Sequence, residues 1–257
     1  MKLYKLSFLA IITMFLFVTC NKETEGLSRS TYYVAFEILG ENPTPVQYGD
    51  PYDDLGVKAT MRMADGTVKD VTSQVKVTGI ENVDINTMGM YYVTYTSPPN
   101  EDGLISKAVR TVIVCNPSVT TDLSGKWKVI EDSGDGDDGT HRVLLSTGAI
   151  TPYGTYANGA PYEVEINRLA PGFFSISDFL AGWYSIRTYP QYAPASAMIG
   201  NFAMNEDNTL FILNSFIGLW EDGLDFFDDA VYDPDNNTLY WKTGYAGSMH
   251  FYIYLTK

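Results

Sequence analysis

The stretch YEVEIN at residues 162–167 decides the fold class of the second half of this chain. Its apolar residues, Tyr162, Val164 and Ile166, alternate with polar ones. Such a period of two is typical of a strand with one face in a core and the other in water. Four further strands are predicted downstream, at 209–213, 226–232, 238–243 and 249–255. Because most of these strands follow one another directly, the sequence predicts a small β-barrel or a curled sandwich over residues 117–257.

The first half of the chain has the same alternation in shorter strands. Residues 32–38 place their even-numbered apolar side chains on one face. Further strands are predicted at 57–63, 75–78, 91–96 and 108–114. This pattern of short strands and turns favours an antiparallel β-sandwich over residues 31–116. Pro117 then breaks the pattern and marks a domain boundary, because proline cannot continue a central strand.

Three stretches of the first half resemble an immunoglobulin-like (Ig-like) repeat of bacterial surface proteins. YGDPYDDLGV at 48–57 is similar to the opening of that domain. VDINTMGMYYVTY at 83–95 is similar to its turn and its Tyr-x-Val-x-Tyr strand, and RTVIV at 110–114 resembles its last strand. The resemblance implies an Ig-like β-sandwich that acts as a spacer or adhesion module and carries no chemistry.

The second half begins with a short motif of its own. Gly125 and Trp127, in the order Gly-x-Trp, are similar to the entry motif of lipocalins, in which the tryptophan plugs the barrel floor. With its Ig-like first half, the chain resembles two-domain Bacteroidetes surface lipoproteins encoded beside SusC/SusD-type nutrient importers. The resemblance implies an all-β protein in which an Ig-like β-sandwich is followed by a small lipocalin-like β-barrel or curled sandwich.

The N-terminal sequence predicts that the protein is exported from the cytoplasm. Residues 1–19 have the plan of a secretory signal peptide, with two lysines, an apolar run and a small residue before the cut. The apolar run is shorter than the ~20 residues of a membrane-spanning helix. FVTC at 17–20 resembles a bacterial lipobox, which implies acylation of Cys20 and a lipid anchor in the outer membrane. The polar residues 20–30 are predicted to form a tether, and their acids resemble the export tag of lipoproteins exposed on the cell surface.

Charge argues against a nucleic-acid-binding protein, and the cysteine content argues against an intrachain disulfide. The net charge of −14 repels phosphate backbones, which argues against nucleic acid as a partner. The chain has two cysteines, so acylation of Cys20 leaves Cys115 without an intrachain disulfide partner. Cys115 closes the apolar run 112–115, which predicts a buried structural thiol.

The acidic segment DSGDGDDG at 132–139 is a candidate metal site. It offers four carboxylates, those of Asp132, Asp135, Asp137 and Asp138. Calcium takes about six to eight oxygen ligands, and loops of this kind can supply them, so calcium is the one cofactor that the sequence suggests. A solvated hairpin loop accounts for the same acids, and both interpretations stay open.

Aromatic residues are concentrated between 153 and 192, and part of this segment is predicted to be a binding loop. Residues 187–195 contain two prolines and no alternation. Flat aromatic faces with nearby polar groups suit sugar rings or peptide side chains. The candidate ligand-binding residues are Trp183, Tyr184, Arg187, Tyr189 and Tyr192. Trp183, Tyr189 and Tyr192 are expected to be exposed because Gly182 and prolines are their neighbours, although each aromatic residue could instead fill a core.

The sequence contains no recognisable catalytic motif. Paired acids at 220–229 could in principle act on a glycoside, but that chemistry requires a defined spacing between two carboxylates, and acidic hairpin ends are commoner. His141 and His250 have no neighbouring ligands that would suggest zinc. We therefore expect a protein that is not an enzyme.

Three functions are compatible with these features. The first is a non-enzymatic accessory lipoprotein that captures an oligosaccharide or oligopeptide nutrient at the cell surface, with a SusC/SusD-type importer complex as its partner. The second is a structural or adhesive surface protein. The third is a lipid carrier of lipocalin type.

Overall fold

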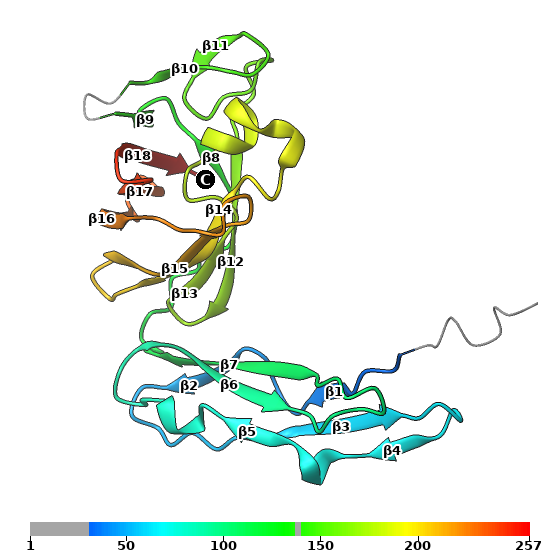
Figure 1. The fold of residues 1–257 in the computed structure, drawn as a ribbon. Coiled ribbons are helices and arrows are strands. Elements are labelled where there is room, and N and C mark those ends of the chain that lie inside the picture. The colour runs from blue at the N-terminus through cyan, green and yellow to red at the C-terminus, as the bar shows by residue number, and fades with distance from the viewer. Residues whose placement is uncertain (1–30, 137–139) are drawn as a thin grey trace, which may run out of the picture. The chain divides into compact units, whose positions relative to one another are not determined.

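A computed structural model describes residues 31–136 and 140–257 (Figure 1). The described chain is built almost wholly from strands, which confirms the predicted all-β class. It divides into two compact units by their internal contacts. The described part of one comprises residues 31–37, 57–76 and 96–107, and the other comprises 38–56, 77–95 and 108–257. Among the described residues, no helix is long and apolar enough to cross a membrane.

The first unit is built around strand β3. Its elements are β3 (Val57–Arg62), β4 (Val68–Asp70), the 3-10 turn η1 (Thr72–Gln74) and most of β1 (Ala35–Ile38), in a sheet of order β1-β3-β4. Val57, Ala59 and Met61 alternate inward along β3 while the residues between them are exposed. Ala59 and Met61 pack with Val34 and Val71 into a small apolar core. β1 begins three residues later than the strand predicted from residue 32.

The second unit begins with a four-stranded sheet of order β2-β7-β6-β5. Its elements are β2 (Thr44–Gln47), β5 (Lys76–Thr78), the 3-10 turn η2 (Ile80–Asn82), β6 (Gly89–Thr96) and β7 (Lys107–Cys115). β2 runs parallel to β7, which differs from the predicted antiparallel arrangement. The apolar end of β7 is fully buried, and Cys115 is a buried free cysteine, as predicted. Burial raises the pKa of the Cys115 thiol.

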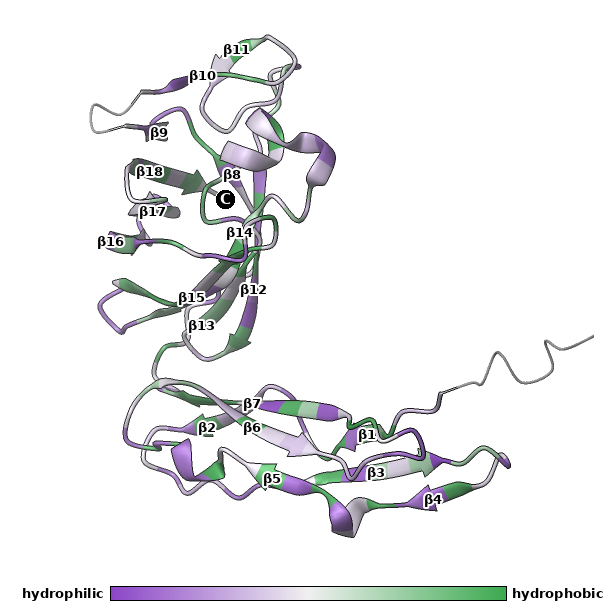
Figure 2. Ribbon diagram, viewed as in Figure 1, coloured by the Kyte–Doolittle hydropathy of each residue, from purple (hydrophilic) through white to green (hydrophobic). Residues whose placement is uncertain are grey.

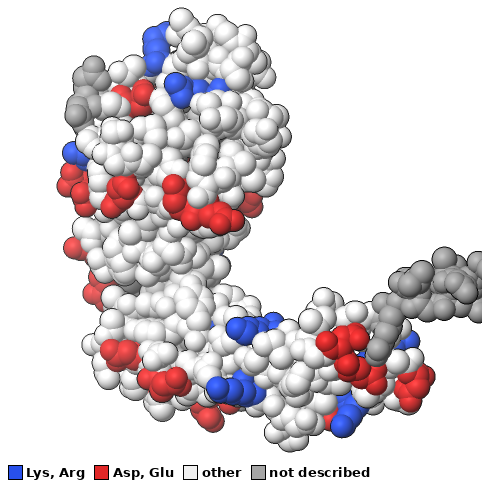
Figure 3. All heavy atoms as spheres, in the orientation of Figure 1, with Lys and Arg blue, Asp and Glu red and all other residues white. Residues whose placement is uncertain are grey.

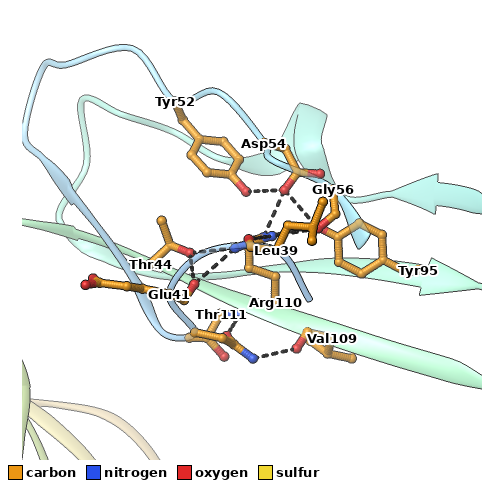
Figure 4. A network of polar contacts seen from close by, with 11 residues as sticks. Leu39, Glu41, Thr44, Tyr52, Asp54, Gly56, Tyr95, Val109, Arg110 and Thr111 are labelled. Atoms are coloured by element: carbon orange, nitrogen blue, oxygen red, sulfur yellow. Dashed lines mark hydrogen bonds and ion pairs between the residues drawn. The ribbon is translucent and has the colours of Figure 1, made fainter. Parts of the chain in front are cut away.

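Arg110 of β7 organises the loops around this sheet (Figure 4). Its Nη2 donates to the carbonyl oxygens of Leu39 at 2.7 Å and Gly56 at 2.9 Å. Its Nη1 donates to Glu41 O and Thr44 Oγ1, both at 3.0 Å. A planar guanidinium can satisfy several acceptors at once, and here it joins the segment that follows β1, the segment before β3 and the start of β2.

The rest of the second unit is a nearly closed β-barrel, which bears out the predicted barrel-like second half. Eight strands follow one another in the order β15-β14-β13-β12-β8-β18-β17-β16, and a short ninth strand, β9, pairs with β18. They are β8 (Gly125–Val129), β9 (Gly134–Asp135), β12 (Glu163–Ala170), β13 (Phe173–Ile176), β14 (Met198–Met204), β15 (Leu210–Ile217), β16 (Phe226–Asp233), β17 (Thr238–Tyr245) and β18 (Met249–Thr256). The last strand in the sequence, β18, pairs with β8, the first strand of this sheet. The edge strands β15 and β16 meet at an isolated bridge between Thr209 and Val231.

Alternation along the strands directs large apolar side chains into this barrel. Figure 2 shows green and purple residues alternating along β12. In β17 and β18, Trp241 and Ile253 face each other in register and are both buried. Trp127, Phe174 and Phe202 are also fully buried. The interior of the barrel is therefore filled with side chains.

Trp127, the tryptophan of the Gly-x-Trp motif, is the middle residue of β8 and is fully buried. Its indole Nε1 donates to Leu123 O at 2.7 Å, and the Lys257 ammonium lies 5.4 Å from its ring centroid. The ring of Tyr232 packs edge-on against it at 6.2 Å. The indole therefore seals one end of the barrel with its polar N–H satisfied.

The loops at the opposite end of the barrel are longer. Because successive strands are antiparallel, the β8–β12, β13–β14, β15–β16 and β17–β18 connections all lie at that end. The first carries the hairpin of β10 (Arg142–Leu144) and β11 (Ile150–Pro152). The second carries a π-helical turn, η3 (Trp183–Thr188), and a 3-10 turn, η4 (Pro190–Tyr192), which form the yellow coiled segment in Figure 1. These loops provide the surface on which the candidate residues lie.

Candidate functional site

The β13–β14 loop is anchored by one buried carboxylate, that of Asp178. Its Oδ1 accepts hydrogen bonds from Leu180 N at 3.0 Å and Met198 N at 3.2 Å. Its Oδ2 accepts from Gly182 N at 2.9 Å and Ser185 Oγ at 3.2 Å. Burial raises the pKa of Asp178, and these donors act in the opposite direction. The carboxylate thus accepts hydrogen bonds from backbone N–H groups that have no ladder partner in this irregular loop, and it fixes the conformation of the loop.

The prediction that Trp183 is exposed is wrong. Its side chain is buried between aromatic rings, stacked on Tyr153 at 5.8 Å and edge-on to Phe251 at 5.2 Å. The Arg187 guanidinium lies 3.9 Å from the centroid of the same indole, in cation–π geometry. Gly182, whose φ is +93°, precedes η3, so the chain turns inward at the position where a glycine had suggested an exposed loop. Trp183 and Arg187 therefore support the loop from beneath.

The other three predicted residues gather in one aromatic cluster. Tyr184 and Tyr189 stack at 5.9 Å, and Tyr192 lies 6.3 Å from Tyr189. Two further residues complete it, one from the β15–β16 turn and one from the end of β17. Trp220 lies 4.8 Å from Tyr184 and 5.4 Å from Tyr189, and Tyr245 lies 5.8 Å from Tyr184. We call these five residues the aromatic platform. Tyr192 and Trp220 are 52% and 42% exposed, so two of its rings face solvent.

Trp220 is held at the apex of a tight turn between β15 and β16. Ile217 N donates to Asp222 O, and Glu221 N donates to Ile217 O, both at 2.9 Å. Glu221 takes a φ of +58°, the left-handed region that few non-glycine residues adopt. Leu219 N donates to Ala195 O at 3.2 Å, which ties this turn to the β13–β14 loop. The platform is therefore assembled from loops that are hydrogen-bonded to one another.

Acidic side chains border the platform. Tyr245 Oη donates to Asp222 Oδ1 at 2.8 Å, and the exposed Asp225 accepts from Gly247 N at 2.7 Å. Burial and the neighbouring Asp222 raise the pKa of Tyr245, and burial raises the pKa of Tyr184. Both phenols are neutral at physiological pH and can donate hydrogen bonds. Figure 3 shows more acidic than basic side chains over the face in view.

A pocket of about 520 Å³ lies at the same end of the barrel. The β13–β14 loop lines it with Ile186 and Pro190, and the β8–β12 connection lines it with Tyr156 and Tyr162. Its walls are mainly apolar, with Ser185 among the polar groups. The loop that carries the platform therefore has a pocket on one side and exposed rings on the other.

Sequence reasoning missed Trp220 and Tyr245. Trp220 lies in the acidic segment 220–229, and Tyr245 lies two residues beyond the strand predicted at 238–243. The available signal was the position of Trp220 between Gly218 and Gly223, since a tryptophan in a turn between strands has little room in a core.

The calcium hypothesis stays a prediction. Asp137 and Asp138 lie outside the described residues. Asp132 is exposed, and Asp135 lies in β9, paired with Phe251. Within residues 31–136 and 140–257, no group of three or more His, Cys, Asp or Glu residues could hold a metal ion. Cys20, the predicted lipidation site, also lies outside the described part of the chain.

Comparisons with known proteins cover both halves of the chain. Residues 36–114 match the family model described as the bacterial surface protein Ig-like domain. Residues 116–257 match a second family model, described as a C-terminal domain. The crystal structure of the lipoprotein BT2262 from Bacteroides thetaiotaomicron is 32% identical in sequence, covering 88% of this chain and 100% of that one, with a TM-score of 0.42. No match is found among curated proteins.

Proposed function

Since this chain belongs to the family of bacterial surface lipoproteins similar to BT2262, we propose that it captures nutrient at the cell surface without chemical conversion. The nutrient would be an oligosaccharide or an oligopeptide, docked on the barrel and passed to an importer of the SusC/SusD type. A lipid on Cys20 would hold the protein in the outer membrane, and the Ig-like domain would act as a spacer.

The observation that carries this proposal is the aromatic platform. Tyr192 and Trp220 are 52% and 42% exposed and belong to one cluster of aromatic rings. A contiguous exposed apolar patch more often marks a binding surface than singly exposed residues do. The loops that hold these rings are fixed by the Asp178 carboxylate and by the Leu219–Ala195 hydrogen bond. Rings held in place before binding cost less entropy when a ligand arrives, so the arrangement favours recognition.

The filled barrel disfavours the lipid carrier. A carrier of lipocalin type needs an apolar cavity between its strands. Trp127, Trp241 and Phe202 occupy that space here. An acyl chain could enter only by displacing well-packed side chains, which is costly in free energy.

A structural or adhesive role is the second candidate. Two observations favour it: a barrel filled by its own side chains and an N-terminal Ig-like domain. An adhesive surface needs no small ligand. The aromatic platform would then contact another macromolecule.

A ligand screen tests these alternatives. The full lipoprotein in detergent would be heated with oligosaccharides, oligopeptides and fatty acids. A ligand present at about 100 times its Kd should stabilise the fold by about 2.7 kcal/mol. Stabilisation by either of the first two classes supports capture, and stabilisation by fatty acids supports the lipid carrier. Unchanged melting with all three leaves the adhesive role.

A further inference from the structure

We infer that the ligand of the aromatic platform is an oligosaccharide of low charge, bound across at least two stacking subsites centred on Trp220 and Tyr192. This inference rests on the proposed capture function and narrows it to one class of nutrient.

The two exposed rings are separate subsites. Trp220 and Tyr192 each contact Tyr189, at 5.4 and 6.3 Å between centroids, so Tyr189 lies between them. The apolar C–H face of a pyranose ring packs well on an aromatic ring face. A single sugar residue covers one such ring, whereas a short chain covers both. Affinity should therefore rise with chain length.

The border of the platform supplies acceptors for sugar hydroxyls. The exposed Asp222 carboxylate uses Oδ1 to accept from Tyr245, and a carboxylate has lone pairs for further donors. Hydrogen bonds to an ionised acceptor are roughly twice as strong as neutral ones. Glu221 and Asp225 are also exposed in this loop. This border suits a ligand rich in hydroxyl donors and repels ligands that carry carboxylates or sulfates.

Peptide recognition usually requires different geometry. Peptides dock as an added strand at a sheet edge, as a helix in a groove, or as a proline-rich segment between aromatic rings. Tyr184, Tyr189 and Trp220 pack against one another at 4.8 to 5.9 Å, so the platform has no gap between these rings for a peptide side chain. The apolar pocket at this end of the barrel is lined by other residues. The partly exposed rings of Tyr192 and Trp220 can instead pack against the C–H face of a pyranose chair.

The experiment measures binding of neutral glucan, mannan, xylan and galactan oligomers, from monosaccharide to hexasaccharide, by calorimetry with the full lipoprotein. Uronate-containing oligomers and a set of basic and neutral peptides are compared in parallel. Variants W220F and W220L separate an aromatic ring from mere apolar bulk, and Y192L tests the second subsite. Tyr48→Leu, at a tyrosine 51% exposed in the Ig-like region, is the matched control.

We expect a neutral oligomer to bind more tightly as its length grows, and uronate oligomers to bind more weakly. W220L and Y192L should each weaken binding about tenfold, the order of an aromatic contact, while W220F and Tyr48→Leu keep most of the affinity. If a peptide binds and W220L abolishes that binding, the proposed capture function stands and the inference of an oligosaccharide ligand is wrong. If an oligosaccharide binds and no platform variant weakens that binding, the proposed capture function stands and the aromatic platform is not the binding site. Silence with every probe would overturn the proposed function itself.

Discussion

Asp54 and Arg110 form a buried ion pair in the Ig-like region, with Arg110 Nε 2.9 Å from Asp54 Oδ1. The Arg110 side chain is 1% exposed and the Asp54 side chain 8%. The same carboxylate oxygen accepts from Tyr95 Oη at 2.6 Å and Tyr52 Oη at 3.0 Å. Desolvation and Asp54 raise the pKa of Tyr52, so this phenol remains a donor at physiological pH. All three Arg110 nitrogens have partners and Asp54 Oδ1 accepts from both phenols, which offsets the cost of desolvating the pair.

Replacing Arg110 with methionine should destabilise the protein by about 3–5 kcal/mol, because it leaves the Asp54 carboxylate buried without its cation. The measurement is chemical denaturation followed by fluorescence. Lys58→Met is the matched control, since Lys58 pairs with Glu37 at 3.7 Å with both side chains more than 60% exposed. That control should change stability by less than about 1 kcal/mol. Equal losses in the two variants would show that burial of the pair is unimportant.

Two tryptophans of the barrel should separate folding from binding. Trp127→Ala should cost about 3–5 kcal/mol, because it removes a fully buried indole from the end of the barrel. Trp220→Ala should cost far less, since Trp220 is 42% exposed, and should reduce ligand binding instead. Thermal unfolding and calorimetry of both variants check this. A loss of stability from Trp220→Ala as large as that from Trp127→Ala would place Trp220 in the core.

Asp178→Asn should loosen the β13–β14 loop while the barrel stays folded. The amide would present N–H groups toward Gly182 N and Ser185 Oγ, where the carboxylate now accepts two hydrogen bonds. We expect a loss of about 1–3 kcal/mol and faster hydrogen exchange over residues 177–197. Asp207→Asn is the control, because the bonds of Asp207 to Thr209 are exposed. Unchanged exchange in the Asp178 variant would contradict the anchoring role.

Acid should destabilise the protein below about pH 4. Hydrogen bonds from neighbouring Thr and Asn residues lower the pKa values of Asp65, Asp70, Asp84 and Asp207 below the ordinary 3.8. The stability that these groups contribute is present above that value and is lost as pH falls through their folded pKa values. Asp178, whose pKa is raised by burial, acts in the opposite direction.

Melting temperatures measured from about pH 6 to about pH 2.5 test this prediction, with Asp84→Asn expected to flatten the acid limb slightly. A melting temperature that rises as pH falls toward about 4 would mean that Asp178, whose raised pKa places its effect above the ordinary value, outweighs the surface carboxylates in that range.

Cys20→Ala should release the protein from membranes. The residue lies outside the described structure, so the prediction comes from the lipobox-like sequence alone. Membrane fractionation and mass spectrometry of the native chain check it. An intact initiator methionine without fatty acid would contradict both the cleavage and the anchor.

Regular parts of the fold were predictable from local patterns. The alternation of residues 249–255 gave β18 with Phe251, Ile253 and Leu255 inside, and the Gly-x-Trp motif located Trp127 at the end of the barrel. Local alternation cannot specify which strands pair over long sequence distances. The parallel pairing of β2 with β7 was therefore missed.

The candidate site was predictable only in part. The sequence predicted a loop over residues 187–195 that holds Tyr189 and Tyr192, with Tyr184 as a further candidate, and the structure brings the three rings together. It could not assign Trp183 to the interior or Trp220 to the surface. Both outcomes depend on contacts with distant residues, Phe251 in one case and Ala195 near the turn of Trp220 in the other.

The seam of the barrel has a mechanical consequence for recognition. β15 and β16 are the edges of the sheet, they meet at the Thr209–Val231 bridge, and the chain that joins them carries Trp220. A ligand bound to both Trp220 and Tyr192 would restrain the loop that joins these two edge strands. Ligand binding should then slow amide hydrogen exchange in β15 and β16 more than in β12 and β13, so exchange in the edge strands would serve as a readout of binding.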